Sequence, residues 1–323
     1  MSVNHFERDG HTSSGSISRR WLNFEQDYFG FPLQIPLIEI QGSSEGPHGV
    51  ILAGVHGDEL NGIQIIHALT EMIAPERLRG KLMLLPVANV PGFLIQSRYM
   101  PDRRDLNRLF PGDKNGSEGS RLAHQIWKGF IEGTDFGIDL HSASYSRWNF
   151  PHIRGNMRME RVRMLARSFG PPNVIHSQGV AGSLRKEATR RGIPLILFEA
   201  GQSNRFEREV VDIGLSGIWS ILVDLEMIDF WPEGLHRPAP VSKYYRKTTW
   251  VRSPAGGLFI PRANPGDLVK KGQNLGEVRS AFGEVICDVK AEKSGSVLGF
   301  NLHPQVVPGR ALYHIAYDEA DLD

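Results

Sequence analysis

Short apolar runs alternate with longer amphipathic stretches between residues 36 and 231. Four of these runs contain almost no polar position, and they cover residues 49–55, 81–87, 136–140 and 193–198. Runs of this length without alternation are typical of strands that are buried on both faces, as in a largely parallel sheet covered by helices.

The stretches between these runs have helical spacing. Residues 60–72 and 120–132 repeat apolar positions every three or four residues, and residues 183–191 form a short polar candidate. Residues 154–167 place five arginines among apolar positions, which indicates a helix with a solvated basic face. The alternation of strands and helices predicts an α/β fold: a doubly wound, largely parallel or mixed sheet covered by helices.

The pattern changes near residue 231. Residues 231–240 contain three prolines and a glycine and predict a linker, and the helical signal stops beyond them. A weak repeat follows, in which Val269, Gly272, Leu275 and Val278 recur 37 positions later as Val306, Gly309, Leu312 and Ile315. Two similar hairpin units predict a smaller all-β barrel or sandwich, and chance matching is the alternative.

The chain therefore divides into three predicted parts. Residues 1–24 are polar and serine-rich and predict a loosely ordered arm or lid. Residues 25–235 form the α/β domain, and residues 241–323 form the C-terminal β domain. A length of 323 residues suits about two domains.

The composition of the chain argues against several classes of protein, including nucleic-acid-binding, membrane-spanning and disulfide-linked proteins. A net charge of +1 gives no electrostatic footprint for nucleic acid or an anionic membrane. The single cysteine, Cys287, excludes an intrachain disulfide and indicates a reducing compartment. No apolar run is long enough for a transmembrane helix, and the first residues lack the layout of a signal peptide. We expect a cytoplasmic protein.

Candidate chemistry follows the ends of the predicted strands. The run ending at Val55 is followed by His56 and, three residues later, by Glu59, while His141 follows the run of residues 136–140. Two histidines and one glutamate form a common ligand set of hydrolytic zinc sites, which leave a fourth position for water. The alternatives are a solvated helix start for His56 and Glu59, and a satisfied core histidine for His141.

Glu199 ends the last of the four runs, at the same expected edge of the sheet. Ligands of open α/β sheets bind at the carboxyl ends of the strands. A carboxylate there can take a proton from a zinc-activated water and pass it to a leaving amine. The alternative is a glutamate that caps the following helix.

Residues 97–112 are dense in arginine and too rich in proline and glycine for a plain helix. A guanidinium can hold a substrate carboxylate or stabilise a developing oxyanion. The alternative is a surface loop whose arginines pair with Asp102 and Asp105.

Four motifs in this order carry a resemblance to a known family. They are Gly54-Val-His-Gly-Asp-Glu-Leu-Asn-Gly62, Asp105-Leu-Asn-Arg108, Asp139-Leu-His141 and Glu199-Ala-Gly201. Over roughly residues 35 to 230, the chain resembles the succinylglutamate desuccinylase/aspartoacylase family of carboxypeptidase A-like zinc hydrolases. The resemblance implies one Zn²⁺ per chain, with His56, Glu59 and His141 as its ligands.

The resemblance also implies roles for other residues. Glu199 would be the general base and acid, and Asn107 and Arg108 would hold a substrate carboxylate. Arg98, which is followed by Tyr99 as in the family, would polarise the scissile carbonyl.

The C-terminal part is similar to the biotinyl/lipoyl-like barrel that some members of the family append. The lysine-bearing hairpin of residues 288–295 lacks the methionine that commonly flanks a modified lysine, so we expect no attached cofactor. The domain is expected to shape the rim of the site or to form a contact in a homo-oligomer.

The main prediction is a zinc-dependent deacylase that hydrolyses a small N-acyl amino acid or a related amide. One alternative is a metallocarboxypeptidase acting on short peptides, and another is a non-catalytic module with a vestigial metal site. Tyr145, Arg147 and Trp148 are candidates for contacting the substrate, because they follow His141 closely.

Overall fold

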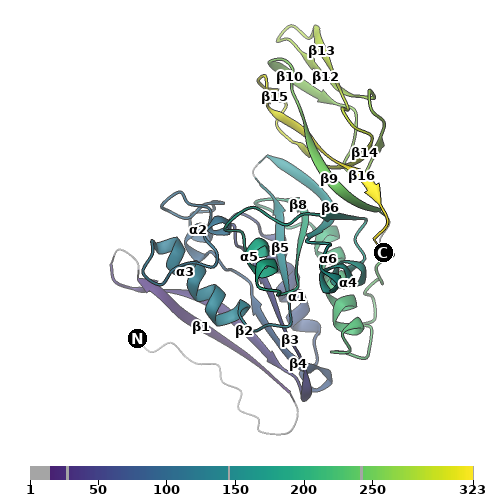
Figure 1. Cartoon of the computed structure of the whole chain (residues 1–323). Coiled ribbons are helices and arrows are strands. Elements are labelled where there is room, and N and C mark those ends of the chain that lie inside the picture. The colour runs from purple at the N-terminus through teal and green to yellow at the C-terminus, as the bar shows by residue number, and fades with distance from the viewer. Residues whose placement is uncertain (1–14, 27–28, 145, 241–242, 323) are drawn as a thin grey trace.

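The computed structural model describes residues 15–26, 29–144, 146–240 and 243–322. A twelve-stranded mixed sheet runs through the molecule (Figure 1). In spatial order its strands are β1 (Ser16–Gln26), β2 (Pro32–Gln41), β4 (Arg79–Leu85), β3 (Ser44–Ala53), β5 (Phe136–Ala143), β8 (Leu195–Gln202), β6 (Arg147–Gly155), β7 (Asn173–His176), β9 (Lys243–Arg252), β16 (Ala311–Ala320), β14 (Gly295–Asn301) and β11 (Leu268–Val269).

Helices cover both faces of this sheet. They are α1 (Asn61–Met72), α2 (Val90–Leu94), α3 (Glu118–Ile126), α4 (Glu160–Phe169), α5 (Leu184–Arg190) and α6 (Arg208–Asp224). One core packs α1, α4 and α6 against the sheet, and a second core packs α3 and α5 against the opposite face. Along β3, Val50 and Leu52 enter the second core while Ile51 and Ala53 enter the first.

Both faces of β3 are therefore buried, as its apolar run predicts. The strands β4, β3, β5 and β8 are parallel to one another, whereas β1 and β2 pair antiparallel to their neighbours. β6 runs antiparallel to β8 and parallel to β7. The prediction of an α/β fold with a mixed sheet is confirmed. No helix within the described residues is long and apolar enough to cross a bilayer.

The prediction of a loosely ordered N-terminal arm is wrong from Ser16 onward. Residues 16–26 form β1, which pairs along its whole length with β2. The segment is polar because β1 is the edge strand and most of its side chains are exposed. Residues 1–14 lie outside the described residues.

The prediction of a helix over residues 154–167 is wrong at its start. Arg154 lies in β6, and α4 begins only at Glu160. No apolar run marks β6, because two of its buried positions are the polar residues Asn149 and His152.

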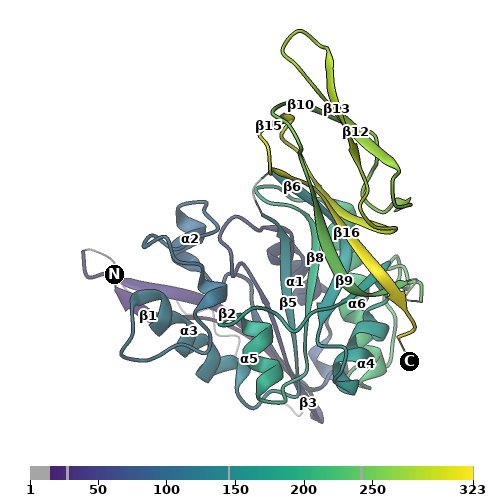
Figure 2. The ribbon, with the colours of Figure 1, turned by 45° about the horizontal axis from the view of Figure 1, so that its top comes forward.

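The C-terminal strands continue the large sheet. β9 pairs with β7, and β14 pairs with β6, so that β6, β7, β9, β16 and β14 close into a ring. Figure 2 shows β9 and β16 running from the helix-covered body into the C-terminal module. The proline-rich stretch near residue 231 thus ends the helices, but it does not end the sheet.

A second sheet completes this module. Its strands are β13 (Val285–Lys290), β12 (Asn274–Arg279), β10 (Gly257–Pro261) and β15 (Gln305–Val306). A separate apolar core lies between the two sheets. In each repeat unit, a two-residue strand is followed by a turn at Gly272 or Gly309, where φ is +84° or +82°. The biotinyl/lipoyl-like fold of this module stays a prediction.

Candidate metal centre and active site

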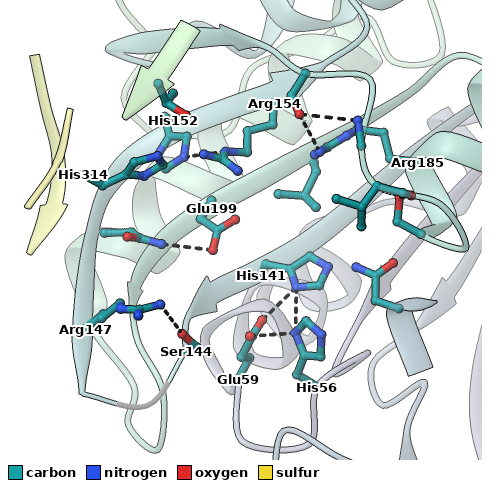
Figure 3. Close-up of a pocket in the computed structure, with 18 of the residues that line it drawn as sticks. His56, Glu59, His141, Ser144, Arg147, His152, Arg154, Arg185, Glu199 and His314 are labelled. Carbon is teal, nitrogen blue, oxygen red and sulfur yellow. Dashed lines mark hydrogen bonds and ion pairs between the residues drawn. The ribbon is translucent and has the colours of Figure 1, made fainter. Parts of the chain in front are cut away.

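The sequence-predicted residues meet at the carboxyl ends of parallel strands. His56 and Glu59 lie in the connection from β3 to α1, while His141 lies in β5 and Glu199 in β8. All four line one cavity of about 460 Å³. Figure 3 shows His56, Glu59 and His141 grouped together, with Glu199 facing the same space.

His56, Glu59 and His141 form a buried cluster. Their ligand atoms lie within 4.8 Å of one another. The Glu59 carboxylate lies between the imidazoles, with Oε1 2.7 Å from His56 Nδ1 and Oε2 2.8 Å from His141 Nδ1. The helix-start and core-histidine alternatives do not describe these residues, because each side chain faces the other two inside the cavity.

Two further carboxylates support the histidines from behind. Asp105 Oδ1 lies 3.2 Å from His56 Nε2, and Asp139 Oδ2 lies 3.0 Å from His141 Nε2. The Ser142 amide donates to Glu59 Oε2 at 3.0 Å. Such partners fix the orientation of an imidazole and leave its other nitrogen available to a metal.

The charges in the cluster depend on one another. Burial alone would lower the pKa of His141, but Asp139 and Glu59 raise that pKa well above its ordinary value. Burial likewise opposes the charge on Glu59, yet His56 and His141 hold the pKa of this carboxyl well below its usual range. The buried carboxylates of the cluster therefore favour a cation beside them, and protons on the imidazoles fill this role when no metal ion is bound.

The donor set fits a zinc ion. Two imidazoles and one carboxylate are borderline and hard ligands of the kind that zinc takes in hydrolytic sites. Each imidazole already has a carboxylate on its far nitrogen. Ligating histidines almost always have a carboxylate, a backbone carbonyl or a water molecule in that position.

Glu199 faces the cavity and does not cap a helix. Asn149 Nδ2 donates to Glu199 Oε1 at 3.0 Å, and α6 begins at Arg208, after a different glutamate. Gly299 of β14 lies against Asn149: a Cβ on this glycine would be 2.4 Å from Asn149 Oδ1. The C-terminal module therefore helps to hold the amide that orients Glu199.

The arginine-rich segment reaches the cluster. Arg98 Nη1 lies 3.2 Å from Glu59 Oε1, and its Nη2 lies 3.1 Å from Asp105 Oδ2. Asn107 and Arg108 occupy a 3₁₀ turn (Leu106–Arg108) and line the cavity. The surface-loop alternative holds for Arg104, which is exposed and pairs with Asp102. Arg98 also pairs with Asp105, as that alternative expects, but it does so inside the cavity and not on the surface.

The cavity also contains residues that sequence reasoning missed. They include Asn149, His152 and Arg154 of β6, Arg185 of α5, and Thr248, Trp250 and His314 of the C-terminal strands. Sequence reasoning also missed the role of Asp139, which lies behind His141 and outside the lining of the cavity. The sequence could have indicated Asp139, because residues two apart in a strand point to the same side and Asp139 precedes His141 by two positions in β5. Of the predicted substrate contacts, Arg147 lines the cavity, Trp148 donates to Glu207, and Tyr145 lies outside the described residues.

The family model of the succinylglutamate desuccinylase/aspartoacylase catalytic domain matches residues 45–225. The chain belongs to this family. It is 26% identical over 300 residues to an N-alpha-acetyl-L-2,4-diaminobutyric acid deacetylase from Halomonas elongata, covering 90% of this chain and 86% of that one. A succinylglutamate desuccinylase from Burkholderia orbicola is also 26% identical, over 79% of this chain and 70% of its own length.

Solved structures share the whole architecture. A succinylglutamate desuccinylase/aspartoacylase from Rhodobacter sphaeroides has a TM-score of 0.84 and 25% identity and matches 99% of both chains. The ectoine utilization protein EutE (DoeB) from Ruegeria pomeroyi has a TM-score of 0.83 over 99% of this chain and 98% of its own. At 21% identity, the latter likeness concerns the fold alone.

Proposed function

We propose that the protein is a zinc-dependent deacylase that hydrolyses the amide bond of a small N-acyl amino acid or a related carboxylate-bearing amide. One observation carries the proposal: a buried His56, Glu59 and His141 cluster shares a cavity with Glu199 and several arginines. The family, and the deacetylase and desuccinylase names of the two relatives, support the same class of reaction.

His56, Glu59 and His141 would hold the zinc ion. A bound zinc ion supplies a Lewis acid and lowers the pKa of a water molecule at its open position. Glu199, oriented by Asn149, would accept a proton from the attacking water and deliver it to the departing nitrogen. Arg98 would donate to the carbonyl oxygen as negative charge develops there.

Asn107 and Arg108 would hold a carboxylate of the substrate. The Asn107 Oδ1 atom accepts from the Leu184 amide at 2.9 Å, so this side chain is fixed with its amide group available. Arg108 Nη1 donates to the Asn107 carbonyl oxygen at 2.6 Å. Both groups are thereby placed at the cavity before a substrate arrives.

Removal of the metal tests the proposal. We expect the purified chain to release amine from N-acyl amino acids, to lose this activity in a chelator, and to regain it with zinc. Elemental analysis should find about one zinc per active chain. Full activity in the chelator would contradict the proposal, and cleavage of blocked dipeptides without cleavage of N-acyl amino acids would favour the metallocarboxypeptidase.

The support from Asp139 gives a second prediction. Asp139→Asn keeps the size of the side chain but removes the charge behind His141, and we expect about 10–100-fold weaker zinc binding. Competition with a zinc chelator of known affinity measures the effect. Asp229→Asn, at a side chain that is 81% exposed, should leave the affinity unchanged. Equal affinities in the two variants would show that Asp139 does not support the site.

The cytoplasmic location and the homo-oligomer expected from the sequence stay predictions.

A further inference from the structure

The cavity carries more positive than negative side chains. Its lining arginines are Arg98, Arg108, Arg147, Arg154 and Arg185, and its lining carboxylates are Glu59 and Glu199. Arg98 is paired with Glu59 and Asp105. Within the described part of the chain, Arg154 and Arg185 form no ion pair with a carboxylate.

Arg185 is a buried guanidinium with unused donors. It is 7% exposed, and its Nη2 donates to Ser177 Oγ at 3.0 Å. Its Nε and Nη1 atoms find no hydrogen-bond partner among the described residues. Burial, followed by the neighbouring Arg154, lowers the pKa of Arg185 to about 10. A buried cation of this kind is unfavourable unless an anion pairs with it.

Arg154 is oriented by a neutral histidine. His152 Nδ1 donates to the Phe150 carbonyl oxygen at 2.7 Å, which leaves Nε2 as an acceptor. Arg154 Nε donates to this Nε2 atom at 3.2 Å. Burial, together with Arg154, lowers the pKa of His152 to about 3, so the acceptor persists at neutral pH. His152 is therefore a positioning residue for the Arg154 guanidinium.

These two arginines lie apart from the metal cluster. Figure 3 shows Arg154 and Arg185 beyond Glu199, on the side of the cavity away from His56, Glu59 and His141. An amide bound between the cluster and Glu199 would extend toward them. We propose that Arg154 and Arg185 form a second anion subsite, so that the substrate carries a carboxylate in addition to the one held by Asn107 and Arg108. This inference rests on the proposed function.

The same charges disfavour a cationic substrate. Among the described residues that line the cavity, the only carboxylates are the proposed zinc ligand Glu59 and the proposed base Glu199. An ammonium group on the substrate would face the guanidinium groups without a counterion. A derivative of a diamino acid, such as the substrate named for the Halomonas elongata relative, should therefore be a poor substrate for this chain.

Four probes test the subsite with the zinc-loaded full chain. They are N-acetyl-L-alanine, N-succinyl-L-alanine, N-acetyl-L-glutamate and N-acetyl-L-2,4-diaminobutyrate. We expect at least one of the two dicarboxylates to exceed N-acetyl-L-alanine at least tenfold in kcat/KM, and the diaminobutyrate to fall below it. The preferred dicarboxylate shows whether the acyl half or the amino-acid half carries the second anion.

The outcomes separate the two hypotheses. Hydrolysis of N-acetyl-L-alanine without any gain from a second carboxylate, or a preference for the diaminobutyrate, would overturn the subsite alone. No hydrolysis of any probe would overturn the proposed function, and the subsite with it.

Variants assign the preference to the named residues. Arg154→Gln should lower the ratio of dicarboxylate to N-acetyl-L-alanine kcat/KM at least tenfold, and Arg154→Lys should recover part of it. His152→Phe removes the acceptor and should lower the same ratio, whereas a general structural defect would reduce both rates alike. Arg208→Gln, at a side chain that is 95% exposed, is the matched control. An unchanged ratio in Arg154→Gln would contradict the inference.

Discussion

The Glu199→Gln variant is expected to bind zinc normally and to lose about 10²–10⁴-fold in kcat. The glutamine side chain of the variant keeps an oxygen that can accept the hydrogen bond from Asn149 Nδ2, so the side chain stays in place. It cannot take a proton from water or return one to the leaving nitrogen. Steady-state kinetics on an N-acyl amino acid, together with elemental analysis of the same sample, measure both parts of the prediction.

Glu226→Gln is the matched control, because this side chain is 84% exposed and lies outside the cavity. It should leave both kcat and zinc content unchanged. A Glu199→Gln enzyme with wild-type turnover would remove Glu199 from the reaction. A variant that lost its zinc would instead place Glu199 in the metal site.

The sequence predicted the central strands and the residues at their ends. β3, β5 and β8 are covered by helices on both faces, so the sequence marks each of them with a run that is almost free of polar residues. β5 and β8 continue a few residues past their runs, to Ala143 and Gln202, so the sequence marks the ends of the runs and not the ends of these strands. His56, His141 and Glu199 come directly at or after the ends of the runs. Parallel pairing of the three strands then brings these residues into one cavity.

The opposite wall of the cavity could not be predicted in this way. β6 lines it with Asn149, His152 and Arg154, and these polar positions remove the apolar run that would have marked a buried strand. Five arginines within residues 154–167 indicate a basic helix when only spacing is considered. In the folded protein the first of these arginines, Arg154, lies in β6 and lines the cavity.

No local sequence pattern predicts that residues of the C-terminal module line the cavity. Trp250 of β9 stacks on His314 of β16, with ring centroids 4.4 Å apart, and Arg147 lies over the Trp250 ring at 4.7 Å. These three residues are far apart in the sequence, and only the pairing of β9, β16 and β14 around β6 and β7 brings them together. The predicted role of this module at the rim of the site agrees with that arrangement.

His141→Ala is expected to abolish stable zinc binding and to lower the free energy of unfolding of the metal-free protein by about 3–5 kcal/mol near pH 6. The substitution leaves two buried carboxylates, Glu59 and Asp139, without the imidazolium that lies between them. Because folding raises the pKa of His141, the pairing contributes fully below the unfolded pKa of about 6.5.

This contribution disappears as the pH rises through the raised pKa, so the difference between wild type and variant should shrink in alkaline buffer. Urea unfolding in a chelator at several pH values measures this dependence. His67→Ala, at an exposed histidine of α1, should show neither the zinc loss nor the pH-dependent difference. If the His141→Ala protein were as stable as wild type near pH 6, some group other than His141 would neutralise Glu59 and Asp139. Arg98 would be the first candidate, because its guanidinium already pairs with Glu59.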